Sequence, residues 1–152
     1  MAARYLDEFE VGQVFETEPV TLSEEDIIGF AERYDPQMFH TDAEAAKDSF
    51  YGGLIASGHQ NIGTAFAQFI RIGVFGENSL GGPAMDNVRW LAPVRPGDTL
   101  VTEAEVLDVR PSKSRPDRGV IRMAFRTSVD GAVVSSFDTT TFLRRAPSED
   151  AA

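Results

Sequence analysis

The chain has 152 residues, 42% hydrophobic and 25% charged, which is typical of one globular domain with a buried core. Its formal net charge of −10 argues against general binding to nucleic acids or to anionic membranes. The absence of cysteine excludes disulfides and thiol nucleophiles, and the two histidines argue against a histidine-rich metal site. No apolar run approaches the roughly 18 residues of a membrane helix, and no signal core opens the chain, so a cytoplasmic location is expected.

The first part of the chain predicts a strand followed by two helices. Residues 15–22 are strand-like, and residues 23–26 (SEED) match a capping box, with acids in the first turn where the helix dipole favours them. The apolar positions that follow have helical spacing, and the helix must end before Pro36. Asp42 can cap a second, short helix over residues 43–47.

A long helix is predicted from His59 onward. Apolar residues recur there at steps of three and four, at Ile62, Ala65, Phe66, Phe69 and Ile70. The interspersed polar residues form no clean stripe, and this pattern suits a helix that is buried on most sides. Residues 73–83 are rich in glycine and are expected to form a loop.

The second half of the chain predicts an antiparallel meander. Runs of strand character cover residues 85–91, 99–110, 120–129 and 132–143. Asp130-Gly131 is a strong two-residue hairpin turn, residues 111–119 are expected to form a loop, and residues 144–152 a disordered polar tail. With no linker and no internal repeat, the pattern indicates a single α+β domain over residues 1–152.

Asp35 and His40 are the strongest candidates for catalysis. Proline at position 36 restricts Asp35 to extended backbone, so we expect His40 at the end of a short irregular loop, with both side chains converging on one point. A neutral histidine can act as a base toward water, and a carboxylate can hold that water or return a proton. The alternative is that Asp35 caps a backbone turn and His40 is a packed loop residue.

Gly58 stands where the long helix begins. Free N–H groups at a helix N-terminus suit a developing oxyanion, and glycine lets a ligand approach the backbone closely. The alternative is a tight entry into a packed helix, with Ser57 as its N-cap. His59 is a candidate for substrate binding or a buried, satisfied imidazole, and Trp90 is interpreted as a core or interface residue.

A basic segment runs through residues 110–126. It has a single acidic residue, Asp117, among six basic ones: Arg110, Lys113, Arg115, Arg118, Arg122 and Arg126. In an acidic protein such a segment can hold a small anionic ligand. A solvated loop with basic strand residues facing water explains the composition equally well.

The sequence resembles the MaoC-like dehydratases and (R)-specific enoyl-CoA hydratases, a family with the hot-dog fold. The residues that carry the resemblance are DPQMFHTD at 35–42, GLIASG at 53–58, VRWLAPVRPGD at 88–98 and SKSR at 112–115. Their order matches the predicted layout, and the resemblance spans roughly residues 5–143. It implies a hot-dog fold, in which an antiparallel sheet wraps around a long central helix.

The resemblance also implies roles. His40 and Asp35 would activate and position a water that adds across a trans-2-enoyl thioester, and the Gly58 N–H would hold the thioester oxygen as it becomes enolate-like. Coenzyme A would be part of the substrate, and no metal or redox cofactor is implied. Family members form dimers with sites near the interface, so a homodimer or a larger homo-oligomer is expected. The candidates for substrate binding are Gln37, Ser57, His59, Arg89, Lys113, Ser114 and Arg115.

Two positions depart from the family pattern. Gln37 stands where hydratases commonly have asparagine, and Met38 where they have proline. The intact pair of Asp35 and His40 favours a hydratase or dehydratase. The alternatives are a hot-dog acyl-CoA thioesterase, in which Asp35 or a neighbouring acid directs a hydrolytic water, and a non-catalytic acyl-CoA-binding subunit.

Overall fold

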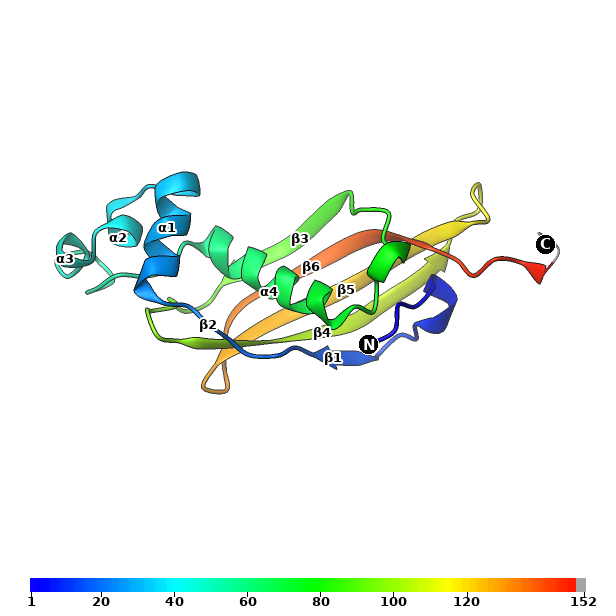
Figure 1. Cartoon of the computed structure of the whole chain (residues 1–152), viewed down its shortest axis with the longest axis horizontal. Coiled ribbons are helices and arrows are strands. Elements are labelled where there is room, and N and C mark those ends of the chain that lie inside the picture. Colours follow the sequence, from blue (N-terminus) through cyan, green and yellow to red (C-terminus); the bar gives the residue numbers. More distant parts are fainter. Residues whose placement is uncertain (150–152) are drawn as a thin grey trace.

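A computed structural model describes residues 1–149 and has the predicted α+β architecture, an antiparallel sheet packed against one long helix (Figure 1). The helices are α1 (Glu24–Tyr34), α2 (Met38–Thr41), α3 (Ala43–Ala46) and α4 (Gly58–Ile72), with 3₁₀ turns η1 (Leu6–Glu8) and η2 (Gly76–Asn78). The strands are β1 (Val14–Glu16), β2 (Val20–Thr21), β3 (Ala84–Trp90), β4 (Thr99–Pro111), β5 (Arg118–Val129) and β6 (Ala132–Arg144). In the described part of the chain, no helix combines the length and apolar character needed to cross a bilayer.

The sheet has the strand order β1-β4-β5-β6-β3, and β2 pairs with β4. The predicted hairpin between β5 and β6 is confirmed: Asp130 and Gly131 both have positive φ, at 50° and 81°, as a type I′ turn requires. The predicted strand over residues 15–22 is two short strands, because β1 and β2 pair separately with β4. The strand β3 forms one edge of the sheet.

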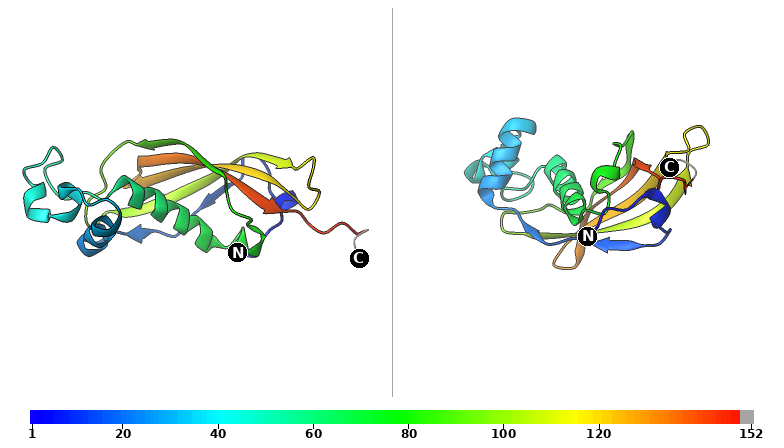
Figure 2. Two further views of the ribbon diagram at one scale, coloured as in Figure 1. Left: turned by 90° about the horizontal axis from the view of Figure 1, so that it is seen from above. Right: turned by 45° about the vertical axis from the view of Figure 1, so that its right-hand side comes forward.

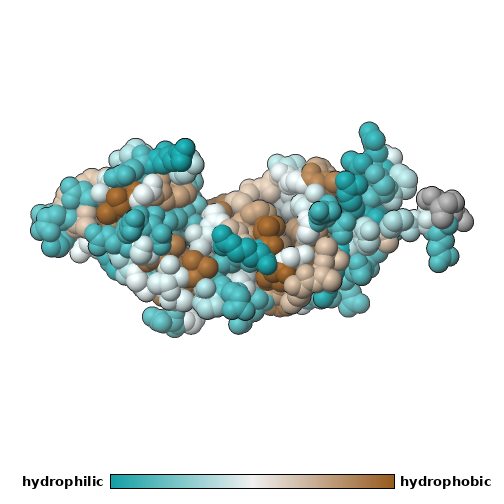
Figure 3. Space-filling view, in the orientation of Figure 1, coloured by the Kyte–Doolittle hydropathy of each residue, from teal (hydrophilic) through white to brown (hydrophobic). Residues whose placement is uncertain are grey.

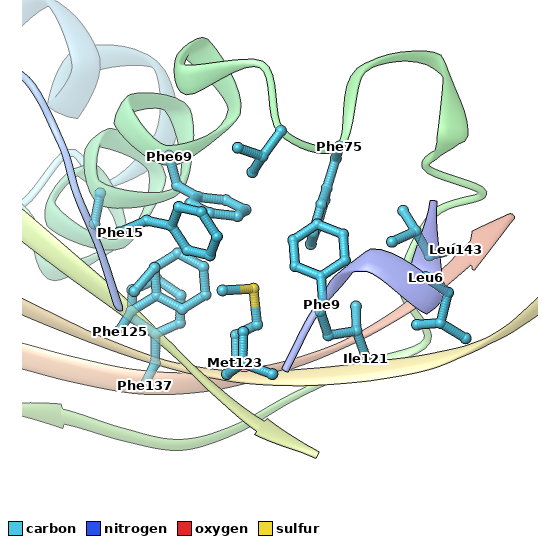
Figure 4. Close-up of a cluster of buried hydrophobic side chains, with 14 of the residues drawn as sticks. Leu6, Phe9, Phe15, Phe69, Phe75, Ile121, Met123, Phe125, Phe137 and Leu143 are labelled. Carbon is cyan, nitrogen blue, oxygen red and sulfur yellow. The ribbon is translucent and has the colours of Figure 1, made fainter. Parts of the chain in front are cut away.

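The main core lies between α4 and the sheet. Alternation along β5 places Ile121, Met123 and Phe125 on the buried face, as predicted. Phe125 stacks on its cross-strand partner Phe137 with ring centroids 4.7 Å apart, and Phe69 of α4 forms a T-shaped pair with Phe125 (Figure 4). This packing fixes α4 across one face of the sheet and thereby fixes where its N-terminus lies.

A buried polar network also joins α4 to the sheet. The Gln68 amide donates hydrogen bonds to the carbonyls of Glu18 and Leu100, both at 2.8 Å, and its oxygen accepts one from the Thr102 hydroxyl at 2.9 Å. Thr102 in turn contacts the Thr127 hydroxyl at 2.9 Å. Since each buried polar group here has a partner, the network allows one register of α4 on the strands.

The three shorter helices form a separate layer at one end of the sheet (Figure 2). The predicted capping box of α1 is present, with Ser23 Oγ accepting from Asp26 N–H and the Asp26 carboxylate accepting from Ser23 N–H, both at 3.0 Å. Ile27 of α1 and Ala46 of α3 pack with Leu100 and Val134 of the sheet in a second apolar cluster. This cluster holds α1–α3 against the sheet and against the segment at Leu54 and Ala56 that leads into α4.

Two local predictions are wrong. His40 lies in the one-turn helix α2 and not in an irregular loop, because the backbone after Gln37 turns helical and Asp42 N–H bonds to the Met38 carbonyl. The tail expected from residue 144 begins later: β6 includes Arg144, and the Arg145 guanidinium lies 2.7 Å from Asp7. The part of the predicted tail at 150–152 lies outside the described residues.

Apolar side chains are also found on the surface. Figure 3 shows apolar residues gathered over part of α4, with hydrophilic ones around them. On and beside the edge strand β3, Met85 is 44% exposed, Trp90 51% and Leu91 61%. Exposed apolar groups on an open sheet edge are typical of a surface that contacts another chain.

Candidate active site

A cavity of about 530 Å³ opens where the three-helix layer, the N-terminus of α4 and the end of β3 meet. Asp35, Gln37, His40, Gly58 and His59 line it, so five of the ten predicted site residues share one cavity. Its apolar lining comes from Phe39, Tyr51, Ile55, Ala56, Trp90, Leu91, Ala92 and Pro93. The cavity therefore combines a few polar groups with an apolar wall, as small-molecule sites do.

The orientation of His40 is set by the backbone. Its ring is buried, and Nδ1 lies 2.7 Å from the Ile55 carbonyl oxygen, which can only accept a hydrogen bond. Nδ1 must therefore carry the hydrogen, and in the neutral ring Nε2 carries the lone pair. Nε2 faces Asp35, with 3.3 Å between Nε2 and Oδ2. His40 thus presents a proton-accepting nitrogen beside a carboxylate.

Asp35 is held as a carboxylate. It is the C-cap residue of α1 with non-helical backbone, and its side chain is 16% exposed. Burial raises the pKa of Asp35, but hydrogen bonds from the Ser57 hydroxyl at 2.7 Å and the Gln37 amide at 2.8 Å, together with the nearby His40 and His59, outweigh burial. The net pKa lies below the ordinary value of 3.8, so Asp35 is ionised at neutral pH.

Gly58 is the first residue of α4. Its N–H is one of the four at a helix N-terminus that have no acceptor within the helix, and the positive end of the helix dipole adds to its pull on an anion. A Cβ at this position would lie 2.4 Å from the Trp90 ring, so only glycine lets the indole pack over the helix start. A developing oxyanion in the cavity can therefore accept a hydrogen bond from Gly58 N–H beside the closely packed Trp90 ring.

Three predicted substrate-binding residues lie at the dyad that Asp35 and His40 form. Gln37 lines the cavity, and its amide nitrogen bonds to Asp35. Ser57 is fully buried behind the cavity, where its hydroxyl donates to Asp35 Oδ2 and accepts from His59 N–H at 3.3 Å. His59 lines the cavity and is exposed, so the alternative of a buried, satisfied imidazole is wrong.

The other four candidates lie elsewhere in the single chain. Arg89 is on the exposed strand β3, and its guanidinium bonds to the neighbouring Val88 carbonyl. Lys113, Ser114 and Arg115 line a second cavity of about 560 Å³ in the β4–β5 loop. That loop is at the opposite end of the sheet from α1–α3 (Figure 1). One chain alone does not bring it to the dyad.

Sequence reasoning missed several features of the cavity. The Ile55 carbonyl that orients His40 leaves no signal in a sequence, because every residue has a carbonyl. Trp90 is half exposed and lines the cavity, so its interpretation as a core residue is wrong within the single chain. Asn61, 3% exposed, lines the cavity as well. A polar residue three positions after Gly58 on a mostly apolar helix was the available signal.

Known proteins are similar to this chain in sequence and in fold. The family model described as MaoC like domain matches residues 8–127. The uncharacterized protein YdeM of Bacillus subtilis strain 168 is 38% identical over 122 residues, which are 80% of this chain and 85% of YdeM. A crystal structure of a MaoC-like dehydratase from Rhodospirillum rubrum has a TM-score of 0.88 at 33% identity, covering 96% of this chain and 100% of that one. The unliganded R-hydratase PhaJ1 from Pseudomonas aeruginosa has a TM-score of 0.76 at 26% identity, covering 93% and 86%.

The family match covers the three-helix layer, α4, the strands β3 and β4 and most of β5, and the structural match extends over nearly the whole chain. With the sheet, the long helix and the cavity already described, this chain belongs to the MaoC-like dehydratase family and has the hot-dog fold.

Proposed function

We propose that the protein catalyses the (R)-specific hydration of an enoyl-CoA, and in reverse the dehydration of a 3-hydroxyacyl-CoA. One observation carries the proposal: an oriented histidine base, an ionised carboxylate and a helix N-terminus all face a single cavity. Acid/base chemistry beside a polarised carbonyl needs these three groups together. The (R) configuration is inferred from the family alone.

In the proposed reaction, a water lies on the cavity side of the Asp35–His40 pair and contacts both groups, which are 3.3 Å apart. His40 Nε2 takes a proton from this water as its oxygen bonds to C3 of the enoyl group. The C2=C3 electron pair moves toward the thioester, whose oxygen becomes enolate-like and accepts a hydrogen bond from Gly58 N–H. The dyad then returns a proton to C2, so that the elements of one water are added and neither residue is consumed.

Ser57 and Gln37 position the carboxylate in this scheme. Each donates to a different oxygen of Asp35, Ser57 to Oδ2 and Gln37 to Oδ1. A carboxylate has about four acceptor sites, so it can still hold the reacting water. Gln37 can also contact the substrate directly, because it lines the cavity.

We infer a homodimer that joins two sheets through β3. This strand has β6 on one side, and with the residue that follows it exposes Met85, Trp90 and Leu91 on a sheet edge. Antiparallel pairing of two β3 edges reverses one chain relative to the other, so the β4–β5 loop of one subunit moves toward the cavity end of its partner. Lys113, Ser114 and Arg115 are in this way candidates for binding the phosphates of coenzyme A held by the other subunit.

The test is turnover of crotonyl-CoA and longer enoyl-CoAs, followed by the loss of enoyl thioester absorbance. Asp35→Asn and His40→Ala are expected to lower kcat by roughly 10²–10⁴-fold, the usual contribution of a general acid or base. Glu32→Gln, a carboxylate change on the exposed side of α1, is the matched control and should keep full activity. Circular dichroism of each variant shows that the fold is retained.

Three outcomes would contradict the proposal. Full activity in both dyad variants would remove the mechanism. Release of free coenzyme A thiol without hydration would instead establish a thioesterase. Tight binding of acyl-CoAs with no turnover on any of them would establish a non-catalytic acyl-CoA-binding subunit.

A further inference from the structure

Two neighbouring amide side chains near the start of α4 are buried with incomplete hydrogen bonding. Gln60 is 7% exposed and Asn61 3% exposed, and in each the side-chain oxygen is buried without a hydrogen-bond partner among the described residues. Buried polar atoms without a partner are rare in folded proteins, and each calls for an explanation.

The two amides differ in their surroundings. Gln60 points toward α1, where its nitrogen donates to the Asp26 carbonyl at 3.0 Å, and it does not line the cavity. Asn61 lines the cavity that holds Asp35, His40 and Gly58. The protein interior stabilises the Gln60 amide through its nitrogen, whereas Asn61 lines the cavity, where a ligand can supply a partner for its amide.

The position of Asn61 indicates which part of a substrate it meets. It follows Gly58 by three residues, which places both on neighbouring parts of one helix face, about 4.5 Å apart along the axis. A thioester oxygen bound at Gly58 N–H would leave the acyl carbons just beyond C3 within reach of the Asn61 amide. The rest of the cavity wall near β3 is apolar, formed by Trp90, Leu91 and Pro93.

We propose that Asn61 selects the acyl group: its carboxamide binds an oxygen-bearing substituent close to the reacting carbons, so the site favours acyl thioesters with a hydroxyl, carbonyl or carboxylate near C4 over plain alkyl chains. This inference rests on the proposed function. A carboxamide offers an NH₂ donor and an oxygen acceptor, and can meet any of these three groups. A site built around such a hydrogen bond rejects substrates that lack the polar group, because the amide is then left unpaired.

The test compares crotonyl-CoA with 4-hydroxycrotonyl-CoA, which differ by one oxygen, and with 3-carboxyacryloyl-CoA, which carries a carboxylate. The wild-type protein is expected to favour at least one of the polar substrates by roughly tenfold in kcat/KM, the effect of one net hydrogen bond. Asn61→Leu, which places two methyl groups where the amide was, should remove this preference. Asn61→Ala should do the same without adding volume. Gln60→Leu is the matched control and should leave the ratio unchanged.

Several results would overturn the inference. An unchanged substrate ratio in both Asn61 variants would show that the amide does not meet the acyl group. An equal loss of kcat/KM on all substrates would mean that Asn61 contacts the thioester or water oxygen that every substrate shares, and not the acyl substituent. A change in oligomeric state of Asn61→Ala, measured by light scattering, would mean that a second subunit satisfies the amide. Competition binding of butyryl-CoA against 4-hydroxybutyryl-CoA measures the same preference without turnover. The selectivity of Asn61 can therefore be tested even if the protein has no hydratase activity.

Discussion

Replacing Ser57 by alanine is expected to destabilise the protein and to disturb Asp35 at the same time. The Ser57 hydroxyl is fully buried, donates to Asp35 Oδ2 at 2.7 Å and accepts from His59 N–H at 3.3 Å. A hydrogen bond to a charged group contributes about 1.5–3 kcal/mol, and a long N-cap bond about 0.5–1 kcal/mol. The free energy of unfolding should therefore fall by roughly 2–4 kcal/mol at pH 7, which lowers Tm on the order of 10 °C for a domain of this size.

The pH dependence of this loss has a definite sign. The pKa of Asp35 is lowered in the folded protein, so its stabilising contribution is complete above the ordinary value of 3.8 and disappears as the pH falls through the lowered pKa. The difference between wild type and Ser57→Ala should thus be largest near neutral pH and should shrink below about pH 3.8 toward the contribution of the cap alone.

The assay is thermal and urea unfolding at one fixed protein concentration, because association also shifts Tm. Ser57→Gly is the matched control: glycine is a tolerated N-cap, so this variant loses the bond to Asp35 but little of the cap. A loss of less than about 0.5 kcal/mol in Ser57→Ala, or a loss that does not depend on pH, would refute the reasoning, since it would place the Ser57–Asp35 bond below the value of an ordinary hydrogen bond.

Three further variants test other parts of the structure. Gly58→Ala places a methyl group where the Trp90 ring lies, so it should shift the tryptophan fluorescence and lower kcat/KM at least tenfold, and the additional change Trp90→Ala should recover part of the stability. Gln37→Ala removes a donor to Asp35, so the pKa of that carboxyl should rise in an NMR titration of its side-chain carbon; an unchanged pKa would contradict the role of Gln37. Gln68→Leu removes three hydrogen bonds, to the carbonyls of Glu18 and Leu100 and from the Thr102 hydroxyl, and should cost about 3 kcal/mol in urea unfolding at about 1 kcal/mol for each bond, while a cost below about 1 kcal/mol would mean that water replaces the amide.

Much of the fold could be predicted because the deciding interactions are local. The capping box that begins α1 needs only Ser23 and Asp26, and the β5–β6 hairpin needs only Asp130 and Gly131. The alternation along β5 and the spacing of apolar residues in α4 follow directly from strand and helix periodicity. The pair Asp35 and His40 was predictable for the same reason, since five residues separate them.

The remaining features depend on contacts between distant segments. The helix α2 has a single turn, too short to be stable by propensity, and forms because His40 is buried and bonded to the Ile55 carbonyl. The bond from Ser57 to Asp35 spans 22 residues and depends on how the start of α4 lies against the end of α1. The basic loop at Lys113 has a clear composition, but its place far from the dyad is a property of the sheet topology.

The carboxylate of Asp7 joins the two ends of the chain. It accepts hydrogen bonds from the Arg145 guanidinium and from Ala146 N–H, and these bonds lower its pKa. Next to it, Leu6 is fully buried against Gly119 of β5. A chain cut before residue 145 would therefore lose the partners of Asp7 and loosen the amino-terminal turn as well, so an affinity tag should leave residues 145 and 146 in place.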